Sequence, residues 1–160
     1  MFNPETAPRA NEYLQYAENA AARLKVEMIA AAVRDEQGLE DVFVTLARKG
    51  DGGVAVYGDN FNRLHRHQII ALSTRYRLPV IYPYRFYAED GGLISYGTDS
   101  IDVLRQAAPY VDRILRGEKP TDLPVQTPTR FELVINLKTA KEIGLAIPPG
   151  LLAIADGVIE

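Results

Sequence analysis

Hydrophobic and polar positions in the first half of the chain follow two patterns that alternate. In some stretches apolar residues recur every three or four positions, which is typical of an amphipathic helix. Between them lie short apolar runs bounded by charge, which are typical of buried strands. The alternation predicts a mainly parallel sheet with helices on both faces. The expected elements are helices over 9–24, 39–46 and 64–76, and strands over 26–33, 54–57 and 78–82.

The pattern changes after Tyr82. Residues 83–90 are aromatic and irregular, and 93–96 have the pattern of a short strand. Asp99 or Ser100 can cap the helix that follows, over roughly 100–116. Pro109 lies inside that helix and predicts a kink, because proline removes a hydrogen bond and clashes with the preceding turn.

The last third of the chain returns to short elements. An extended connector over 117–128 precedes a strand over 131–136, a short helix over 138–143 and a final helical turn within 148–155. We expect the main sheet to be built by four strands, with the strand at 93–96 apart from it or at its margin. Those four strands are 26–33, 54–57, 78–82 and 131–136.

Composition places the chain among globular proteins of about one domain. Its 160 residues are 47% apolar and 24% charged, with a net charge of −3 and no cysteine. The basic residues are scattered, which speaks against nucleic acid as a partner. The first residues have neither the basic start nor the apolar run of a signal peptide, which by itself indicates the cytoplasm.

Two patterns that can signal chemistry have simpler structural explanations. His65 and His67 stand two positions apart on a predicted helix, so their side chains point in different directions and cannot share a metal ion. The glycine-rich segment 50–53 runs from a helix end to a strand start, whereas phosphate-binding loops run from strand to helix. No motif indicates catalysis or a cofactor.

Polar and aromatic residues gather where predicted strands end, which is where open α/β sheets bind ligands. Asp59 and Asn60 follow one strand, and Tyr84 and Arg85 follow the next along the chain. Aromatic walls and a guanidinium suit a ligand with a carboxylate and an apolar body. Local turn chemistry for the first pair, and an aromatic cluster under a loop for the second, are the alternatives.

Three segments resemble the carboxy-terminal half of the ABC transporter substrate-binding proteins, a branch of the type 1 periplasmic-binding-protein fold. The segments are 65–83 (HRHQIIALSTRYRLPVIYP), 84–97 (YRFYAEDGGLISYG) and 128–149 (PTRFELVINLKTAKEIGLAIPP). The resemblance implies a two-lobed, non-enzymatic binder of about twice this length, without a cofactor. It divides the chain into 1–84 and 118–160 in the carboxy-terminal lobe, and 85–117 as an excursion into an absent amino-terminal lobe.

The same resemblance implies partners, location and site. The partners would be a small solute such as an amino acid or a similar carboxylate, the membrane permease and ATPase subunits of an ABC transporter, and the missing lobe. The full-length protein would be periplasmic, or extracellular and lipid-anchored, and this chain a truncated fragment. By position, Asn3, Asp59, Tyr84 and Arg85 would face the ligand, joined by Asn60.

The alternative is a self-contained intracellular domain of flavodoxin-like or regulator type. An apolar stripe on the helix at 100–116 separates the two hypotheses. A self-contained domain would bury the stripe against the helices at 9–24 or 64–76, whereas a lobe without its partner would leave it exposed. The stripe consists of Leu104, Ala107, Ala108, Val111, Ile114 and Leu115.

Overall fold

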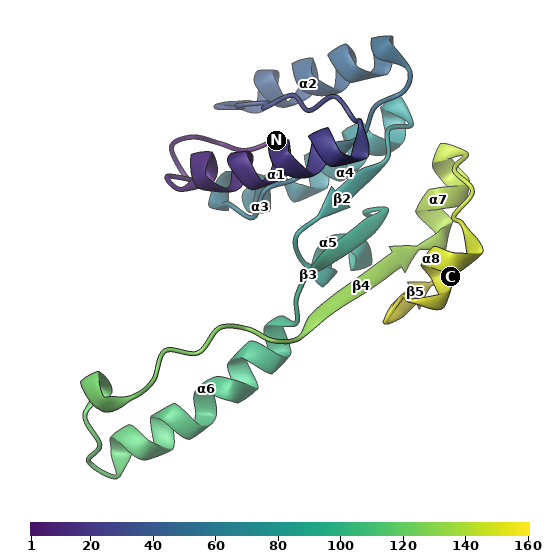
Figure 1. The fold of residues 1–160 in the computed structure, drawn as a ribbon. Helices are drawn as coiled ribbons and strands as arrows, with labels where there is room; N and C mark the ends of the chain where they lie inside the picture. Colours follow the sequence, from purple (N-terminus) through teal and green to yellow (C-terminus); the bar gives the residue numbers. More distant parts are fainter.

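The computed structural model describes residues 1–160 and contains a five-stranded mixed sheet (Figure 1). In spatial order the strands are β1 (Val54–Ala55), β2 (Val80–Tyr82), β3 (Ile94–Thr98), β4 (Phe131–Asn136) and β5 (Gly157–Ile159). Neighbours are parallel except for β3 and β4, which run antiparallel. Beyond β1 the sheet continues through Met1–Phe2, where Phe2 forms a parallel bridge to Ala32.

Eight α-helices and one 3₁₀ turn connect the strands. Sequence signals set several of their ends: Asp35 caps α2 by accepting from the Gly38 N–H, and Gly144 ends α7 in a left-handed conformation. None of the helices combines the length and hydropathy needed to cross a membrane. The helices are α1 (Ala10–Leu24), α2 (Glu36–Lys49), α3 (Asn60–Leu64), α4 (Arg66–Tyr76), α5 (Arg85–Glu89), α6 (Ser100–Leu115), α7 (Leu137–Ile143) and α8 (Pro149–Ala153), and the 3₁₀ turn is Pro120–Asp122.

The main hydrophobic core lies on one face of the sheet. There α2 and α4 contribute Phe43 and Ile69, which pack in one cluster with Val80 and Tyr82 of β2. Helix α5 packs against β2, β3 and β4 on this face, and Tyr87 of α5 joins the same cluster. The apolar sides of α2 and α4, which the spacing of the sequence predicted, are therefore buried on this face of the sheet.

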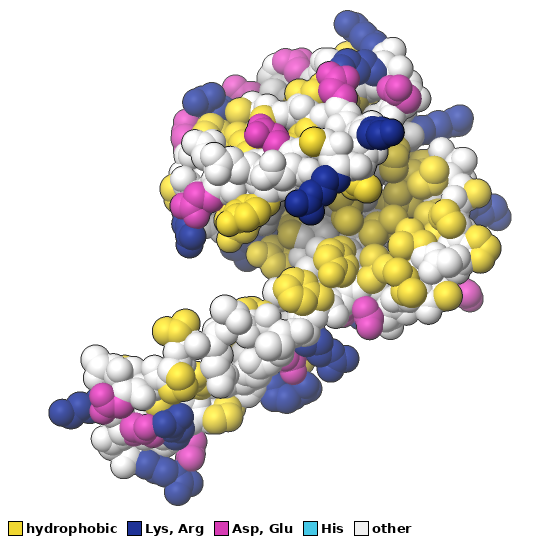
Figure 2. All heavy atoms as spheres, in the orientation of Figure 1, with side chains coloured by type: hydrophobic (Ala, Val, Ile, Leu, Met, Phe, Trp, Pro, Cys, Tyr) yellow, Lys and Arg dark blue, Asp and Glu magenta, His cyan; other side chains and the backbone are white.

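On the other face of the sheet Leu133 and Ile135 of β4 are also buried, and a helix lies over one end. There α1 packs against Phe2 and Tyr57 in a small separate cluster. The register aligns Ile81, Ile94, Ile135 and Val158 across β2 to β5 on this face. Tyr96 and Phe131 lie on the same face and are 55% and 50% exposed. Figure 2 shows hydrophobic side chains gathered on the body of the molecule. We call this surface the open face; its exposed large members are Ile81, Tyr96, Phe131 and Val158.

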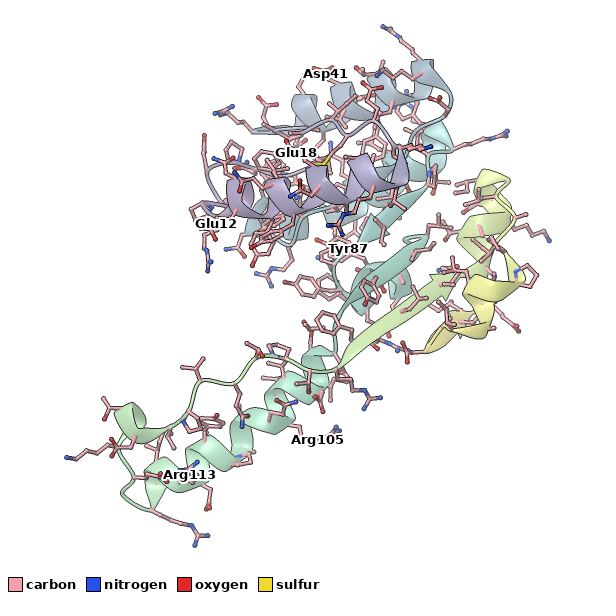
Figure 3. The ribbon with its side chains drawn as sticks, viewed as in Figure 1. Glu12, Glu18, Asp41, Tyr87, Arg105 and Arg113 are labelled. Atoms are coloured by element: carbon pink, nitrogen blue, oxygen red, sulfur yellow. The ribbon has the colours of Figure 1, made fainter.

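Residues 99–130, which we call the arm, project from the body (Figure 1). Helix α6 has no buried residue, and the connector returns alongside it, held where the Tyr110 hydroxyl donates to the Pro124 carbonyl at 2.6 Å. Figure 3 shows Arg105 and Arg113 along this helix, far from Tyr87 in the body. The expected exposure of the apolar stripe is confirmed: Leu104 is 73% and Leu115 81% exposed.

Several sequence predictions need correction. The segment 26–33 is not a buried strand: only its last residues pair, with Phe2, and Val26 and Ile29 are exposed at the sheet end. Residues 85–89 of the irregular aromatic segment form α5. The helix expected at 100–116 is present as α6 and continues through Pro109, and the kink expected at that proline stays a prediction.

The placement of the strand at 93–96 was also wrong. This strand, β3, lies in the middle of the sheet between β2 and β4. Gly97 makes the position possible, because a Cβ there would come within 1.9 Å of the Pro83 carbonyl oxygen. The closing strand β5 was not predicted at all, and it pairs with β4 at the sheet edge.

Candidate functional site

A cleft of about 500 Å³ opens at the carboxyl ends of the parallel strands. The loops after Phe2, β1, β2 and β3 all contribute to it, as expected for a ligand site in an open α/β sheet. Its lining is mostly polar, with aromatic rings on one side. The lining residues are Thr6, Gly58, Asp59, Asn60, Arg63, Tyr84, Phe86 and Ser100.

Asp59 is the structural centre of the cleft floor. Its Oδ1 accepts hydrogen bonds from the Asn62 N–H at 2.8 Å, capping α3, and from the Thr6 hydroxyl at 3.2 Å. Its Oδ2 accepts from the Asn62 side-chain amide at 2.9 Å and from the Asn3 N–H at 3.1 Å. The buried carboxylate therefore already has four donors, and it holds the loops after Phe2 and β1 together.

Asn3 lies beneath the cleft rather than in its lining. It is almost fully buried, and its Oδ1 accepts from the Glu5 N–H at 2.8 Å and the Thr6 N–H at 3.2 Å. This is the local turn chemistry that short polar side chains favour. Its side chain shapes the loop that presents Thr6 to the cleft.

Tyr84 and Phe86 form the aromatic wall. Their rings stack with centroids 5.6 Å apart, and the stack continues from Phe86 to the buried Tyr87 at 4.7 Å. Gly58 lets Tyr84 lie close to the β1 loop, since a Cβ at Gly58 would approach the Tyr84 hydroxyl to 3.0 Å. This packing accounts for the glycine immediately before Asp59.

Arg85 does not line the cleft, although the sequence analysis placed it beside the ligand. As the first residue of α5 it pairs with Glu89 one turn later at 2.8 Å and with Glu132 of β4 at 3.1 Å. Glu132 holds the guanidinium against β4. The two carboxylates raise the pKa of Arg85, with the hydrogen bond to Glu89 as the largest cause. The structure thus brings together Asp59, Asn60 and Tyr84, with Asn3 beneath them and Arg85 outside.

The cation in the cleft is Arg63, which the sequence analysis did not select. Its exposed guanidinium forms no hydrogen bond or ion pair within the chain. Thr6, Phe86 and Ser100 were also missed. The available signal for Arg63 was its position one helical turn after Asp59 on α3; for Ser100 there was none, because β3 was expected outside the sheet.

Comparison with known proteins identifies the class. The fold is that of one lobe of a periplasmic-binding-protein-like domain. The model of the family described as ABC transporter substrate binding protein matches residues 2–159, and the chain belongs to this family. No curated protein matches the chain.

Solved structures resemble the chain over half of their own length. A conserved domain protein from Vibrio cholerae is 27% identical, with a TM-score of 0.84, over 98% of this chain and 52% of that one. An ABC domain in complex with L-Trp from Streptococcus pneumoniae is 23% identical, with a TM-score of 0.80, over 94% and 52%. The ligand-free, open structure of a substrate-binding protein with adhesive properties from Clostridium difficile is 19% identical, with a TM-score of 0.66, over 94% and 50%.

Proposed function

We propose that this protein is the solute-binding component of an ABC transport system and that its solute binds in the cleft at the strand ends. Membership of the substrate-binding family supports the role. The position of the cleft supports the site, because four loops of the sheet meet there. The solute would bind reversibly and pass unchanged to the membrane permease, which the ATPase subunits drive.

The proposed solute is a small carboxylate with an apolar or aromatic body, such as an amino acid. One observation carries this choice: the free guanidinium of Arg63 lies in the same cleft as the stacked rings of Tyr84 and Phe86. A guanidinium binds a carboxylate with two parallel hydrogen bonds, and aromatic rings bind flat apolar groups. The side chains of Asn60 and Ser100, which form no hydrogen bond within the chain, remain for an amine or hydroxyl.

Asp59 would act as a positioning residue in this site. Its carboxylate is occupied by donors from Asn3, Thr6 and Asn62. We infer that it holds Thr6, and the α3 helix that carries Arg63, in the geometry that the solute requires. Its loss would weaken solute binding through these loops rather than through a lost direct contact.

We also propose that a second, amino-terminal lobe closes over this cleft in the full-length protein and packs on the arm. The exposed stripe of α6 supports this, and so does the twofold length of the matched structures. Because β3 lies within the sheet and α5 packs on it, the proposed excursion is shortened from 85–117 to the arm itself. Under this proposal the chain is a fragment of a periplasmic, or extracellular and lipid-anchored, receptor.

The exposure of α6 speaks against the alternative of a self-contained domain of regulator type. It required Leu104, Val111 and Leu115 to be buried against α1 or α4. All three are exposed, and α6 contributes no residue to any of the hydrophobic clusters.

Backbone amide NMR of the isotopically labelled chain, titrated with a panel of amino acids at millimolar concentrations, tests the solute proposal. We expect aromatic amino acids to shift the amides of 58–63, 84–86 and Ser100. Arg63→Ala should weaken binding about tenfold or more, as expected for an unpaired charged hydrogen bond. Asp59→Ala should weaken binding by a similar factor. Arg23→Ala removes an exposed arginine of α1, outside the cleft, and should change nothing.

Two results would contradict the proposal. Shifts that persist unchanged in Arg63→Ala would remove the carboxylate contact from this cleft. Shifts confined to residues outside the loops at the strand ends would place the solute site elsewhere on the protein.

A further inference from the structure

Ser100 is the only residue of the arm that lines the cleft. It stands at the first position of α6, immediately after the Asp99 cap. The other lining residues belong to the body, where Asp59 already ties the loops after Phe2 and β1 together. The position of Ser100 therefore depends on how the arm is fixed to the body.

The two strands that lead into the arm are held firmly as far as its root. Gly97 of β3 packs directly on the loop after β2. Glu132, the ladder partner of Gly97 in β4, forms an ion pair with Arg85 at 3.1 Å. The last pair of the ladder joins Thr98 to Phe131. The body thus fixes both strands up to the residues next to the arm.

One residue pair then joins the arm to these strands. The Asp99 N–H donates to the Arg130 carbonyl at 3.1 Å, and Asp99 Oδ2 lies 3.4 Å from Arg130 Nε. Beyond this pair, α6 contributes no residue to any hydrophobic cluster of the body. The direction of α6 at its first turn therefore depends on Asp99 and Arg130.

The carboxylate of Asp99 bonds to both sides of this junction. Its Oδ2 faces Arg130, while its Oδ1 accepts from the Ile101 N–H at 3.0 Å and from the Asp102 N–H at 3.1 Å. These bonds lower the pKa of Asp99, with the hydrogen bond from Asp102 as the largest cause. A capped first turn is fixed, whereas an uncapped helix end frays. Ser100 lies in that first turn, so the cap of Asp99 also fixes Ser100.

We propose that Asp99 is a positioning residue of the solute site, which holds Ser100 at the cleft through its helix cap and its pair with Arg130. This inference rests on the proposed function, because it concerns the same cleft. It gives the arm the counterpart of a device in the body. Asp59 caps α3, which carries Arg63, and Asp99 caps α6, which carries Ser100.

A double-mutant cycle in the titration with aromatic amino acids tests this role. Ser100→Ala and Asp99→Ala should each weaken binding by about fivefold, as expected for one lost hydrogen bond. The double variant should bind no more weakly than the weaker single variant, because Asp99 acts through Ser100. Asp99→Asn keeps an oxygen for the cap and should recover part of the affinity. The matched control is Asp112→Ala, which removes an acid of α6 that pairs with Arg116 at 2.9 Å outside the cleft, and it should change nothing.

Three results of the cycle would overturn the proposal. The first is an unchanged affinity in Asp99→Ala. The second is a double variant in which the two losses add, since Asp99 would then act on the cleft independently of Ser100. The third is an Asp99→Asn variant that binds no better than Asp99→Ala, because the cap would then not hold Ser100.

Residual dipolar couplings of the backbone amides separate this inference from the proposed function, because they need no solute. In the unmodified chain, the couplings of α6 and α2 should fit one common orientation. In Asp99→Ala the couplings of α6 should shrink, since its first turn is no longer fixed, and unchanged couplings would overturn the proposal. If no amino acid binds, the proposed function fails, whereas these couplings still decide whether Asp99 holds Ser100 in place.

Discussion

Helices α2 and α6 have the same kind of amphipathic spacing and opposite fates in the structure. In α2, Leu39 and Phe43 are completely buried against α4 and the sheet. In α6 the corresponding apolar line is exposed from end to end. The comparison teaches that periodicity predicts a helix and its apolar side, whereas burial of that side depends on what the rest of the fold brings to it.

The largest expected effect is the difference in unfolding free energy between two side-chain truncations, one in α2 and one in α6. Phe43→Ala in α2 should lower the free energy of unfolding by about 3–5 kcal/mol, because it removes a buried ring and leaves a cavity. Leu104→Ala in α6 should change it by less than about 0.5 kcal/mol, as for other exposed positions. Urea unfolding at concentrations where the chain is monomeric measures both. Comparable losses in the two variants would show that the arm is part of the folded core.

The next effect is the pH dependence of the free energy of unfolding that the buried Tyr82 causes. Burial raises the pKa of Tyr82 to about 12, against 10 for an exposed phenol. The folded state therefore keeps the proton that the unfolded state loses, and stability present below pH 10 should fall as the pH rises toward 12. The loss should reach about 2–3 kcal/mol from this side chain. Tyr82→Phe should show a shallower decline in urea unfolding at pH 10–12, and an unchanged slope would contradict the assignment.

The smallest global effect is expected in the arm. Pro109→Ala restores a backbone donor inside α6 and should stabilise that helix by up to about 3 kcal/mol. Because α6 packs on none of the hydrophobic clusters, amide hydrogen exchange should slow in α6 and stay unchanged in α2, with the urea midpoint almost unmoved. If the urea midpoint rose together with the hydrogen-exchange protection of α6, the arm and the body would unfold together.

The candidate site could be predicted in part. Asp59, Asn60 and Tyr84 were found because they follow predicted strands, and the rule for parallel sheets places strand ends together. Arg63 and Arg85 could not be told apart in the same way. Their roles depend on whether a carboxylate lies within reach, and Glu132, which binds Arg85, is 47 residues away in the chain.

The sequence by itself determined the elements whose signals are local. The capped and terminated helices α2 and α7, the strand at 131–136 and the apolar stripe of α6 all follow from spacing, caps and glycines within a few residues. Tertiary structure alone decided the order of the strands. It placed β3 at the centre, where Gly97 lies close to Pro83, and it left 26–33 at the end of the sheet, joined only by the bridge from Ala32 to Phe2. The reason is physical: strand pairing and ion pairing join residues far apart in the chain, and no local pattern records which partner lies opposite.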